Sequence, residues 1–178
     1  MLLGITVRRF FVIEVKVSGV AMDDRYKSPV VILQEKDGER VLPIWIGGSE
    51  AHAIMSQLAG KKFQRPLTHD LLVNVIKDLK AKVLKVMITD LKENTFYAEV
   101  LLQRKNELVK IDARPSDSIA LAVRTSSPIF IAEKLLEDRP WQKKPKKKSE
   151  KEVREERAKD LKKFLENLRL EDFGKFSL

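Results

Sequence analysis

The order of hydrophobic and polar residues predicts strands and helices in alternation between residues 11 and 131. Residues 11–17 alternate with a period of two, which is typical of a half-buried strand. Apolar runs at 30–33 and 41–46 predict two more strands, and the Asp37-Gly38 pair between them predicts a hairpin turn with positive φ. Pro43 has no backbone N–H, so the third strand is expected at a sheet edge or at a bulge.

The next segment changes to a helical period. Four apolar residues follow the spacing i, i+3, i+4 and i+7, namely Ala51, Ile54, Met55 and Leu58. Gly60 is placed to end this helix in the left-handed conformation. Thr68 is expected to cap a second amphipathic helix, whose apolar residues are Leu71, Leu72, Val75, Ile76 and Leu79.

A second half of the chain repeats this order. Strands are predicted at 83–89, 95–102 and 108–113, a helix from Pro115 or Ser116, and a last short strand at 129–131. Five positions of the first half match five of the second at one offset, 116 − 49 = 67: Ile44, Ser49, Glu50, Ala53 and Ile54 correspond to Ile111, Ser116, Asp117, Ala120 and Leu121. Neither half can bury both faces of its own sheet. We therefore predict an α+β fold in which a duplicated antiparallel β-meander plus helix unit, with pseudo-repeats 10–80 and 81–135, shares one core.

The composition changes after residue 138. We predict a domain at 1–138, a basic linker with prolines at 139–148, and an amphipathic C-terminal helix with its tail at 149–178. Ser149 and Glu152 form a capping box at the start of that helix. Its apolar stripe recurs at 3-4-3 spacing, at Ala158, Leu161, Leu165 and Leu168. A stripe this narrow needs a partner surface, so we expect the helix to protrude and the chain to form a homo-oligomer, with a dimer favoured.

The residue types that are missing exclude several kinds of chemistry. The 178 residues contain no cysteine, which excludes disulfides, thiolate metal sites and a cysteine nucleophile. No organic cofactor is predicted. Glu14 and Lys16 interrupt the first apolar stretch before a signal-peptide core is complete, and no run is long enough to span a membrane. We expect a cytoplasmic protein without a membrane partner.

Positive charge is concentrated at the C-terminal end. The formal net charge is +9, of which residues 139–178 carry 14 − 8 = +6 and residues 1–138 carry 21 − 18 = +3. The basic run consists of Lys143, Lys144, Lys146, Lys147 and Lys148. These lysines are candidates for contact with a nucleic-acid backbone, and a solvated linker is the competing interpretation. No segment has the alternating aromatic and basic pattern that is typical of a single-strand stacking platform.

Three ordered blocks carry a family resemblance. Residues 65–70 read Arg-Pro-Leu-Thr-His-Asp, residues 112–122 read Asp-Ala-Arg-Pro-Ser-Asp-Ser-Ile-Ala-Leu-Ala, and residues 44–47 with Glu50-Ala51 form the third block. Together they resemble the bifunctional nuclease family over about residues 10–137. The resemblance implies cleavage of both DNA and RNA, and it makes the chain a possible hydrolase with nonspecific nucleic-acid partners.

Within these blocks the resemblance suggests a nuclease site. The candidate catalytic residues are His69, Asp70, Asp112, Arg114 and Asp117, and the candidate metal ligands are Glu50, Asp112 and Asp117. Phosphodiester hydrolysis commonly uses carboxylates to hold divalent ions, here Mg²⁺ or Mn²⁺, a base for attack, and a cation for the developing charge. His69 fits the base and Arg114 the cation. Arg65 is a further candidate for backbone contact.

Structural roles compete with each of these assignments. Glu50, Asp70 and Asp117 each fall in a predicted first helical turn, where a carboxylate satisfies free amides. Arg114 can form an ion pair that fixes the turn, and His69 can be an ordinary residue of a helix start. The alternative function is therefore a non-catalytic oligomeric module that binds a small ligand or a protein partner.

Overall fold

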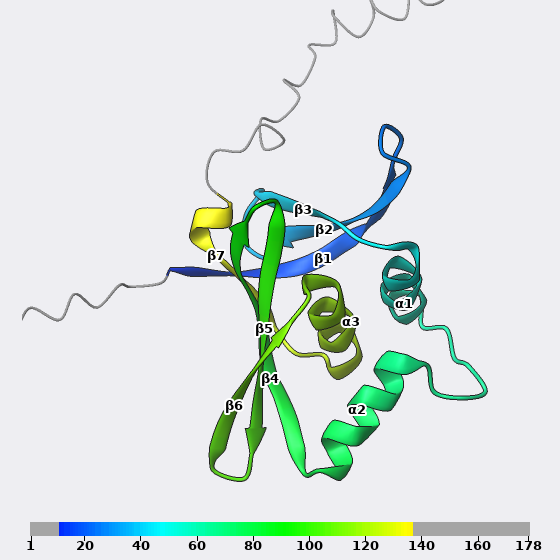
Figure 1. Ribbon diagram of the computed structural model, residues 1–178, viewed down its shortest axis with the longest axis vertical. Helices are drawn as coiled ribbons and strands as arrows, with labels where there is room; N and C mark the ends of the chain where they lie inside the picture. The colour runs from blue at the N-terminus through cyan, green and yellow to red at the C-terminus, as the bar shows by residue number, and fades with distance from the viewer. Residues whose placement is uncertain (1–10, 137–178) are drawn as a thin grey trace, which may run out of the picture. The chain divides into compact units, whose positions relative to one another are not determined.

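The computed structural model describes residues 11–136, which form one seven-stranded sheet with three α-helices on one face (Figure 1). These residues belong to the first of two units into which the chain divides, residues 1–142. The predicted linker at 139–148 and the C-terminal helix at 149–178 lie outside the described residues. No helix within residues 11–136 is long and apolar enough to cross a bilayer.

Two antiparallel three-stranded meanders flank a short central strand. The strand order is β3-β2-β1-β7-β4-β5-β6, and β7 is antiparallel to β1 but parallel to β4, so the sheet is mixed. The first meander consists of β1 (Val12–Asp23), β2 (Ser28–Glu35) and β3 (Val41–Trp45). The second consists of β4 (Ala81–Lys92), β5 (Thr95–Arg104) and β6 (Glu107–Ala113), and β7 is Ile129–Ala132.

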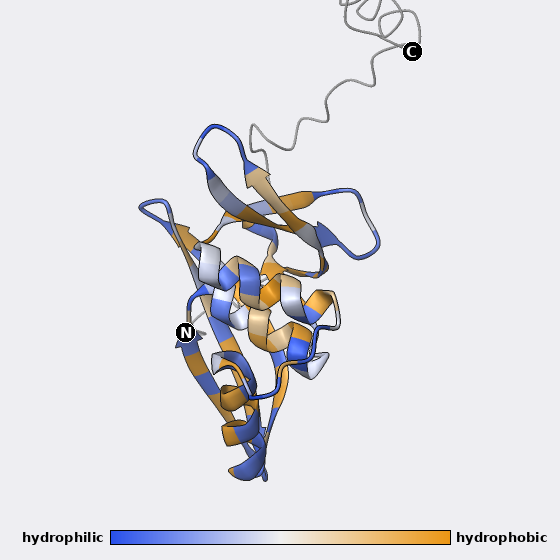
Figure 2. Ribbon diagram, turned by 90° about the vertical axis from the view of Figure 1, so that its right-hand side faces the viewer, coloured by the Kyte–Doolittle hydropathy of each residue, from blue (hydrophilic) through white to orange (hydrophobic). Residues whose placement is uncertain are grey.

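Each edge strand leads directly into a helix. The helix α1 (Gly48–Leu58) follows β3, and α3 (Pro115–Thr125) follows β6, while α2 (Thr68–Asp78) connects α1 to β4. A short 3₁₀ helix, η1 (Glu133–Leu135), follows β7. Viewed from the helix side, α1, α2 and α3 stand in front of strands that alternate hydrophobic and hydrophilic residues (Figure 2). The buried apolar core lies between these two layers and includes Leu33, Ile54, Ile88, Ile119 and Ile131.

Several predictions from the pattern are confirmed. The fold is α+β, and all predicted strands and helices within the described residues are present. Pro43 lies in β3, which is an edge strand of the sheet. Gly60 has a φ of 64° and follows α1 as expected. The two meanders occupy equivalent places around β7, while the duplication of sequence that would explain them stays a prediction.

Two local predictions were wrong. Neither Asp37 nor Gly38 has a positive φ, because the connection from β2 to β3 is longer than a two-residue turn. It is closed instead by a hydrogen bond from Glu35 N–H to the Arg40 carbonyl and by an ion pair between the same two side chains. Thr68 does not cap α2, because it is the first helical residue. The Asp70 carboxylate instead accepts a hydrogen bond from the backbone N–H of Leu67.

Candidate functional site

The first turns of all three helices meet around one hollow of about 520 Å³. Helix starts present unpaired N–H groups and a partial positive charge, so this hollow is electrostatically distinct from the rest of the surface. Its polar and charged lining residues are Ser49, Glu50, His52, Thr68, His69, Arg114 and Asp117. Arg114 and Glu50 also line a neighbouring hollow of about 270 Å³.

The sequence around Arg114 fixes its place at the start of α3. A residue that precedes proline is driven into extended conformation, and Arg114 has φ −68° and ψ 148°. Pro115 then occupies the first helical position, where its missing N–H costs no hydrogen bond. Arg114 is therefore the N-cap residue of α3, and its long side chain extends over the helix start toward its neighbours.

The Arg114 guanidinium joins two carboxylates from different helices. Its Nε donates to Asp117 Oδ2 at 2.7 Å and its Nη2 to Asp117 Oδ1 at 3.2 Å. Its Nη1 lies 3.0 Å from Glu50 Oε1 on α1. The Arg114 side chain is 65% exposed and the Glu50 side chain 20%. The ion pair expected for Arg114 is therefore present in the structure, and the guanidinium is still exposed to solvent.

His69 completes the cluster from α2. Its Nε2 lies 3.2 Å from Asp117 Oδ1, and its side chain is 14% exposed. An ionised carboxylate only accepts hydrogen bonds, so Nε2 carries a proton, and in the neutral imidazole Nδ1 then carries the lone pair. Asp117 thereby orients the imidazole and selects its tautomer.

The charges around Asp117 keep it ionised. Partial burial by itself would raise the pKa of Asp117, but the hydrogen bonds from Arg114 and His69 and the positive charge of Arg114 outweigh it, so this pKa lies below its usual value. The same hydrogen bond to Asp117, with the charges of Asp117 and Glu50, raises the pKa of Arg114. Both groups are charged across the physiological range.

Asp70 is directed away from this cluster and holds a different partner. Its Oδ1 accepts from Arg124 Nε at 2.7 Å, and the Arg124 side chain is only 5% exposed. Arg124 also donates to the Ala120 carbonyl at 3.0 Å. Burial favours a higher pKa for Asp70, but the hydrogen bonds from Arg124 and Leu67 and the positive charge of Arg124 lower it overall. Arg124 was not predicted, because 54 residues separate it from Asp70.

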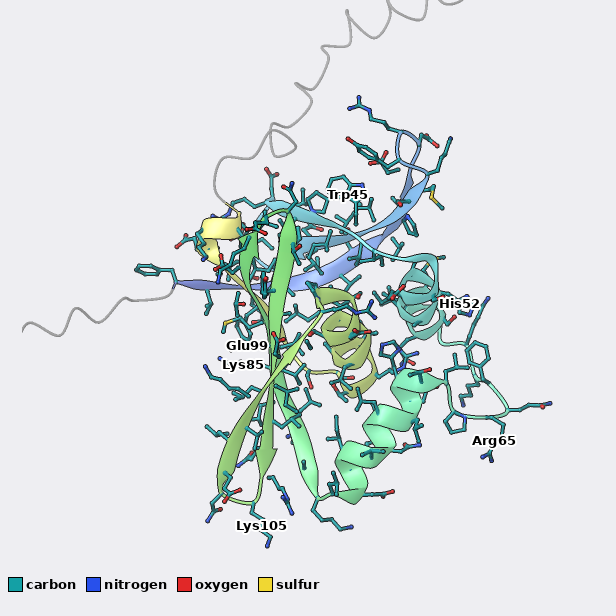
Figure 3. The ribbon with its side chains drawn as sticks, viewed as in Figure 1. Trp45, His52, Arg65, Lys85, Glu99 and Lys105 are labelled. Atoms are coloured by element: carbon teal, nitrogen blue, oxygen red, sulfur yellow. The ribbon has the colours of Figure 1, made fainter. Side chains whose placement is uncertain are left out.

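The structure does not bring Asp112 to the hollow. Asp112 lies in β6 opposite Glu99, while the next residue, Ala113, lies opposite the buried Ala98. Successive side chains in a strand point to opposite faces, so Asp112 projects from the sheet face away from the core. Arg65 is exposed in the loop between α1 and α2 (Figure 3), and the lysines at 143–148 lie outside the described residues.

The donor set does not fit a divalent ion in this arrangement. Within residues 11–136 there is no group of three or more His, Asp or Glu side chains placed to hold a metal. Glu50 and Asp117 both direct carboxylate oxygens at Arg114, and Asp112 is on the other sheet face. Oxygen ligands of Mg²⁺ or Mn²⁺ would have to be released from the guanidinium first.

Comparison with known proteins gives the family. The model of the bifunctional nuclease domain matches residues 31–144. The chain belongs to the bifunctional nuclease domain family. The matched range contains every residue of the cluster, from Glu50 through His69 to Arg114 and Asp117. The expected family membership is confirmed.

Individual relatives of this family differ in how much of their length is shared. An uncharacterized protein of Mycobacterium tuberculosis is 39% identical over 162 residues, which cover 90% of this chain and 97% of that protein. Bifunctional nuclease 1 of Arabidopsis thaliana is 26% identical over 117 residues, which cover 64% of this chain and 36% of the plant protein. Bifunctional nuclease 2 of Oryza sativa subsp. japonica is 28% identical over 107 residues, 58% of this chain and 33% of that protein.

Proposed function

We propose that this member of the bifunctional nuclease domain family cleaves phosphodiester bonds in DNA and RNA without sequence preference, at the hollow between the three helix starts. The observation that carries the proposal is the contact of His69 and Arg114 with one carboxylate, that of Asp117. Through Asp117, the His69 imidazole, which can accept a proton, is held near the Arg114 guanidinium, which can bind phosphate. The names of the plant relatives support the same reaction class.

His69 acts as the general base in this proposal. The hydrogen bond from its Nε2 to Asp117 leaves Nδ1 to accept the proton of an attacking water. The imidazolium that forms is stabilised by the Asp117 carboxylate, whose lowered pKa keeps it negative. As the water oxygen bonds to phosphorus, the P–O bond to the leaving sugar oxygen breaks, and the imidazolium returns its proton to that oxygen. Water as the nucleophile needs no 2′-hydroxyl, so the same groups serve DNA and RNA.

Arg114 binds the phosphate. Three of the five N–H donors of its guanidinium point at Asp117 and Glu50, which leaves 5 − 3 = 2 for phosphate oxygens. The two carboxylates hold the guanidinium in place before the substrate arrives, so less side-chain freedom is lost on binding. The phosphate is the same at every nucleotide, so a contact with phosphate does not depend on the base sequence. We therefore propose nonspecific cleavage.

A requirement for Mg²⁺ or Mn²⁺ stays a separate proposal. Because the donor set does not fit a divalent ion as it stands, none of the steps above depends on one. If cleavage needs a metal, Glu50 and Asp117 are the carboxylates of the hollow that would have to leave Arg114 to bind it. A cleavage assay with each ion and with a chelator distinguishes the two cases.

The test uses the full chain with end-labelled single- and double-stranded DNA and RNA, in Mg²⁺, Mn²⁺ or EDTA. We expect Asp117→Asn, His69→Gln and Arg114→Met each to lower the cleavage rate by about 10²-fold or more. The matched control is Asp112→Asn, which removes the same charge on the far face of the sheet and should leave the rate within about twofold of the unmodified chain. A rate that Asp117→Asn leaves intact and Asp112→Asn abolishes would place the chemistry elsewhere.

The second candidate is a non-catalytic module that binds a small ligand. The observation that favours it is that this hollow, of about 520 Å³, gathers polar and charged side chains from the starts of three helices. Native mass spectrometry of the purified chain tests this candidate. A bound small molecule that Arg114→Met releases, in protein that cleaves none of the nucleic acids, supports the module and excludes the nuclease.

A further inference from the structure

The loop between α1 and α2 combines positive charge with an exposed aromatic ring. Residues 61–65 read Lys-Lys-Phe-Gln-Arg, and all five are exposed. Lys61, Lys62 and Arg65 make no ion pair within the part of the chain that the structure describes, so their charges are available to a partner. Phe63 is 44% exposed, although burying an apolar ring away from water would be energetically favourable.

This loop adjoins the hollow of the proposed nuclease site. The Phe63 ring lies with its centroid 6.4 Å from that of His52, tilted by 58°, and His52 lines the hollow on α1. Pro66, at the other end of the loop, lines it as well. His52 and Arg65 both lie on the side of the molecule where this loop connects α1 to α2 (Figure 3). A strand bound along the loop would therefore lead toward Arg114.

We propose that this loop binds single-stranded nucleic acid, with one base stacked on Phe63 and the backbone phosphates on Lys61, Lys62 and Arg65. Stacking needs an unpaired base with a free face, which a duplex does not offer. The inference deepens the proposed function, on which it rests for the direction of the strand, because it selects single strands as the substrate class. Binding itself does not depend on cleavage.

The chain offers a matched control in the turn between β1 and β2. Tyr26 is 65% exposed and flanked by Arg25 and Lys27, so it has the same basic and aromatic pattern. Here, however, Asp23 and Asp24 balance the two cations, and Lys27 lies 3.8 Å from Asp24. A local sequence pattern without net charge is not expected to bind a polyanion.

The test is fluorescence anisotropy of a labelled single-stranded oligothymidylate and of a duplex of equal length, in EDTA, with the full chain. We expect Phe63→Ala to weaken single-strand binding by about fivefold or more and to leave duplex binding within about twofold. The triple variant Lys61→Gln, Lys62→Gln, Arg65→Gln should make the slope of log affinity against log salt shallower by about 0.7 for each phosphate that it no longer binds. Tyr26→Ala, in the turn between β1 and β2, and Lys105→Gln, in the turn between β5 and β6, should change neither the affinity nor this slope.

The outcomes separate this inference from the nuclease proposal. If the unmodified chain cleaves nucleic acids and Phe63→Ala binds single strands with unchanged affinity, the stacking site is overturned and the nuclease proposal stands. A chain that cleaves nothing but loses single-strand affinity in Phe63→Ala retains the site and overturns the nuclease. Equal losses in Phe63→Ala and Tyr26→Ala would show that the loop has no special role.

The edge strand β6 carries a second, independent inference. All its residues from Glu107 to Asp112 are exposed, and three of them are apolar: Leu108 at 64%, Val109 at 40% and Ile111 at 44%. An uncovered edge strand is a template for pairing with another strand. The opposite edge, β3, contains Pro43, which removes one donor there, whereas β6 contains no proline.

Opposite charges on β6 favour pairing with a second copy in one register. We infer that β6 pairs antiparallel with β6 of a second copy, with Ile111 facing Ile111 across the twofold axis. This register places Lys110 opposite the partner's Asp112 on both sides and Val109 opposite the partner's Ala113. A register centred on Lys110 would instead oppose two like charges, and one centred on Asp112 would do the same. A shift of one β6 strand by one residue would place residues of the core-facing side opposite residues of the outer face, so these registers are excluded.

The absence of cysteine makes a direct test possible. In the proposed register the Cα atoms of the two Ile111 residues lie about 4.5–5.5 Å apart, within disulfide reach. We expect Ile111→Cys to form a covalent dimer on mild oxidation. Val109→Cys should stay uncrosslinked, because the two copies of residue 109 are four positions apart along the paired strands. Lys110→Asp should weaken the dimer in analytical ultracentrifugation, and adding Asp112→Lys should restore it. A strict monomer at micromolar concentration, or equal crosslinking of both cysteine variants, overturns this inference.

Discussion

His69 and Asp117 are 48 positions apart in the chain, and His69 Nε2 lies 3.2 Å from Asp117 Oδ1. The contact connects the first turn of α2 to the first turn of α3, and Asp117 holds Arg114 with the same carboxylate. One carboxylate therefore positions both groups to which we assign chemistry. Its loss should affect them together.

The first prediction concerns this coupling. Asp117→Asn and His69→Gln should each lower the cleavage rate by about 10²-fold or more, and the double variant should be no slower than the slower single variant, because residues that act as a unit are not additive. Single-turnover cleavage rates measure this. Multiplicative losses in the double variant would mean that the two side chains act separately.

The buried pair of Asp70 and Arg124 should contribute to stability. Asp70→Ala leaves the nearly buried Arg124 guanidinium without its carboxylate, so we expect the free energy of unfolding to fall by about 3 kcal/mol. Adding Arg124→Met should recover much of the loss, because the uncompensated charge is removed. Urea unfolding of the four chains of this cycle measures the coupling, and additive losses would contradict it.

Acid should destabilise the protein through the same carboxylates. The pKa values of Asp70 and Asp117 are lower in the folded chain than the usual 3.8, so the folded state binds fewer protons than the unfolded state. Their contribution is complete above that value and is lost as the pH falls through the lower folded-state pKa values. The free energy of unfolding from urea titrations between pH 7 and pH 2 should decrease in that window. In Asp70→Asn and Asp117→Asn the decrease should be smaller.

Gly47 leaves room for the Glu50 carboxylate. A Cβ atom on Gly47 would collide with Glu50 Oε2, so Gly47→Ala should move this carboxylate away from Arg114. We expect Gly47→Ala to lower cleavage by about tenfold, to the level of Glu50→Gln, because the guanidinium loses one of its two supports. Gly48→Ala is the matched control, since a Cβ there meets no atom within 4 Å. Equal rates in the two alanine variants would contradict the role of Glu50.

Ser118 is a point where the core can be improved. Its hydroxyl is buried and has no hydrogen-bond partner among the described residues. Ser118→Ala should raise the free energy of unfolding by about 1 kcal/mol, because an unsatisfied polar group is removed. Thr125→Val is the contrasting change: its hydroxyl donates to the Leu121 carbonyl at 2.9 Å, so its loss should be destabilising. Thermal unfolding of both variants measures the two signs.

The sequence by itself determined the secondary structure and the candidate residues near the helix starts. Strand alternation, helical stripes and Pro115 are local signals, and each acts over a few residues. They located the elements, the edge strand with Pro43 and the turns that carry Glu50, His69, Arg114 and Asp117. The family blocks pointed to the same turns. The sequence Lys-Lys-Phe-Gln-Arg at 61–65 is a further local signal, but the larger basic run near the C-terminus dominates the net charge and hides it.

Only the tertiary structure decided which of these residues act together. Asp112 and Arg114 are two positions apart, yet strand alternation sends Asp112 to the far face of the sheet, opposite Glu99. Asp70 and His69 are adjacent, yet one contacts Arg124 and the other Asp117, each on α3. Contacts between helices depend on how their axes pack over the shared core, and no local pattern encodes that packing.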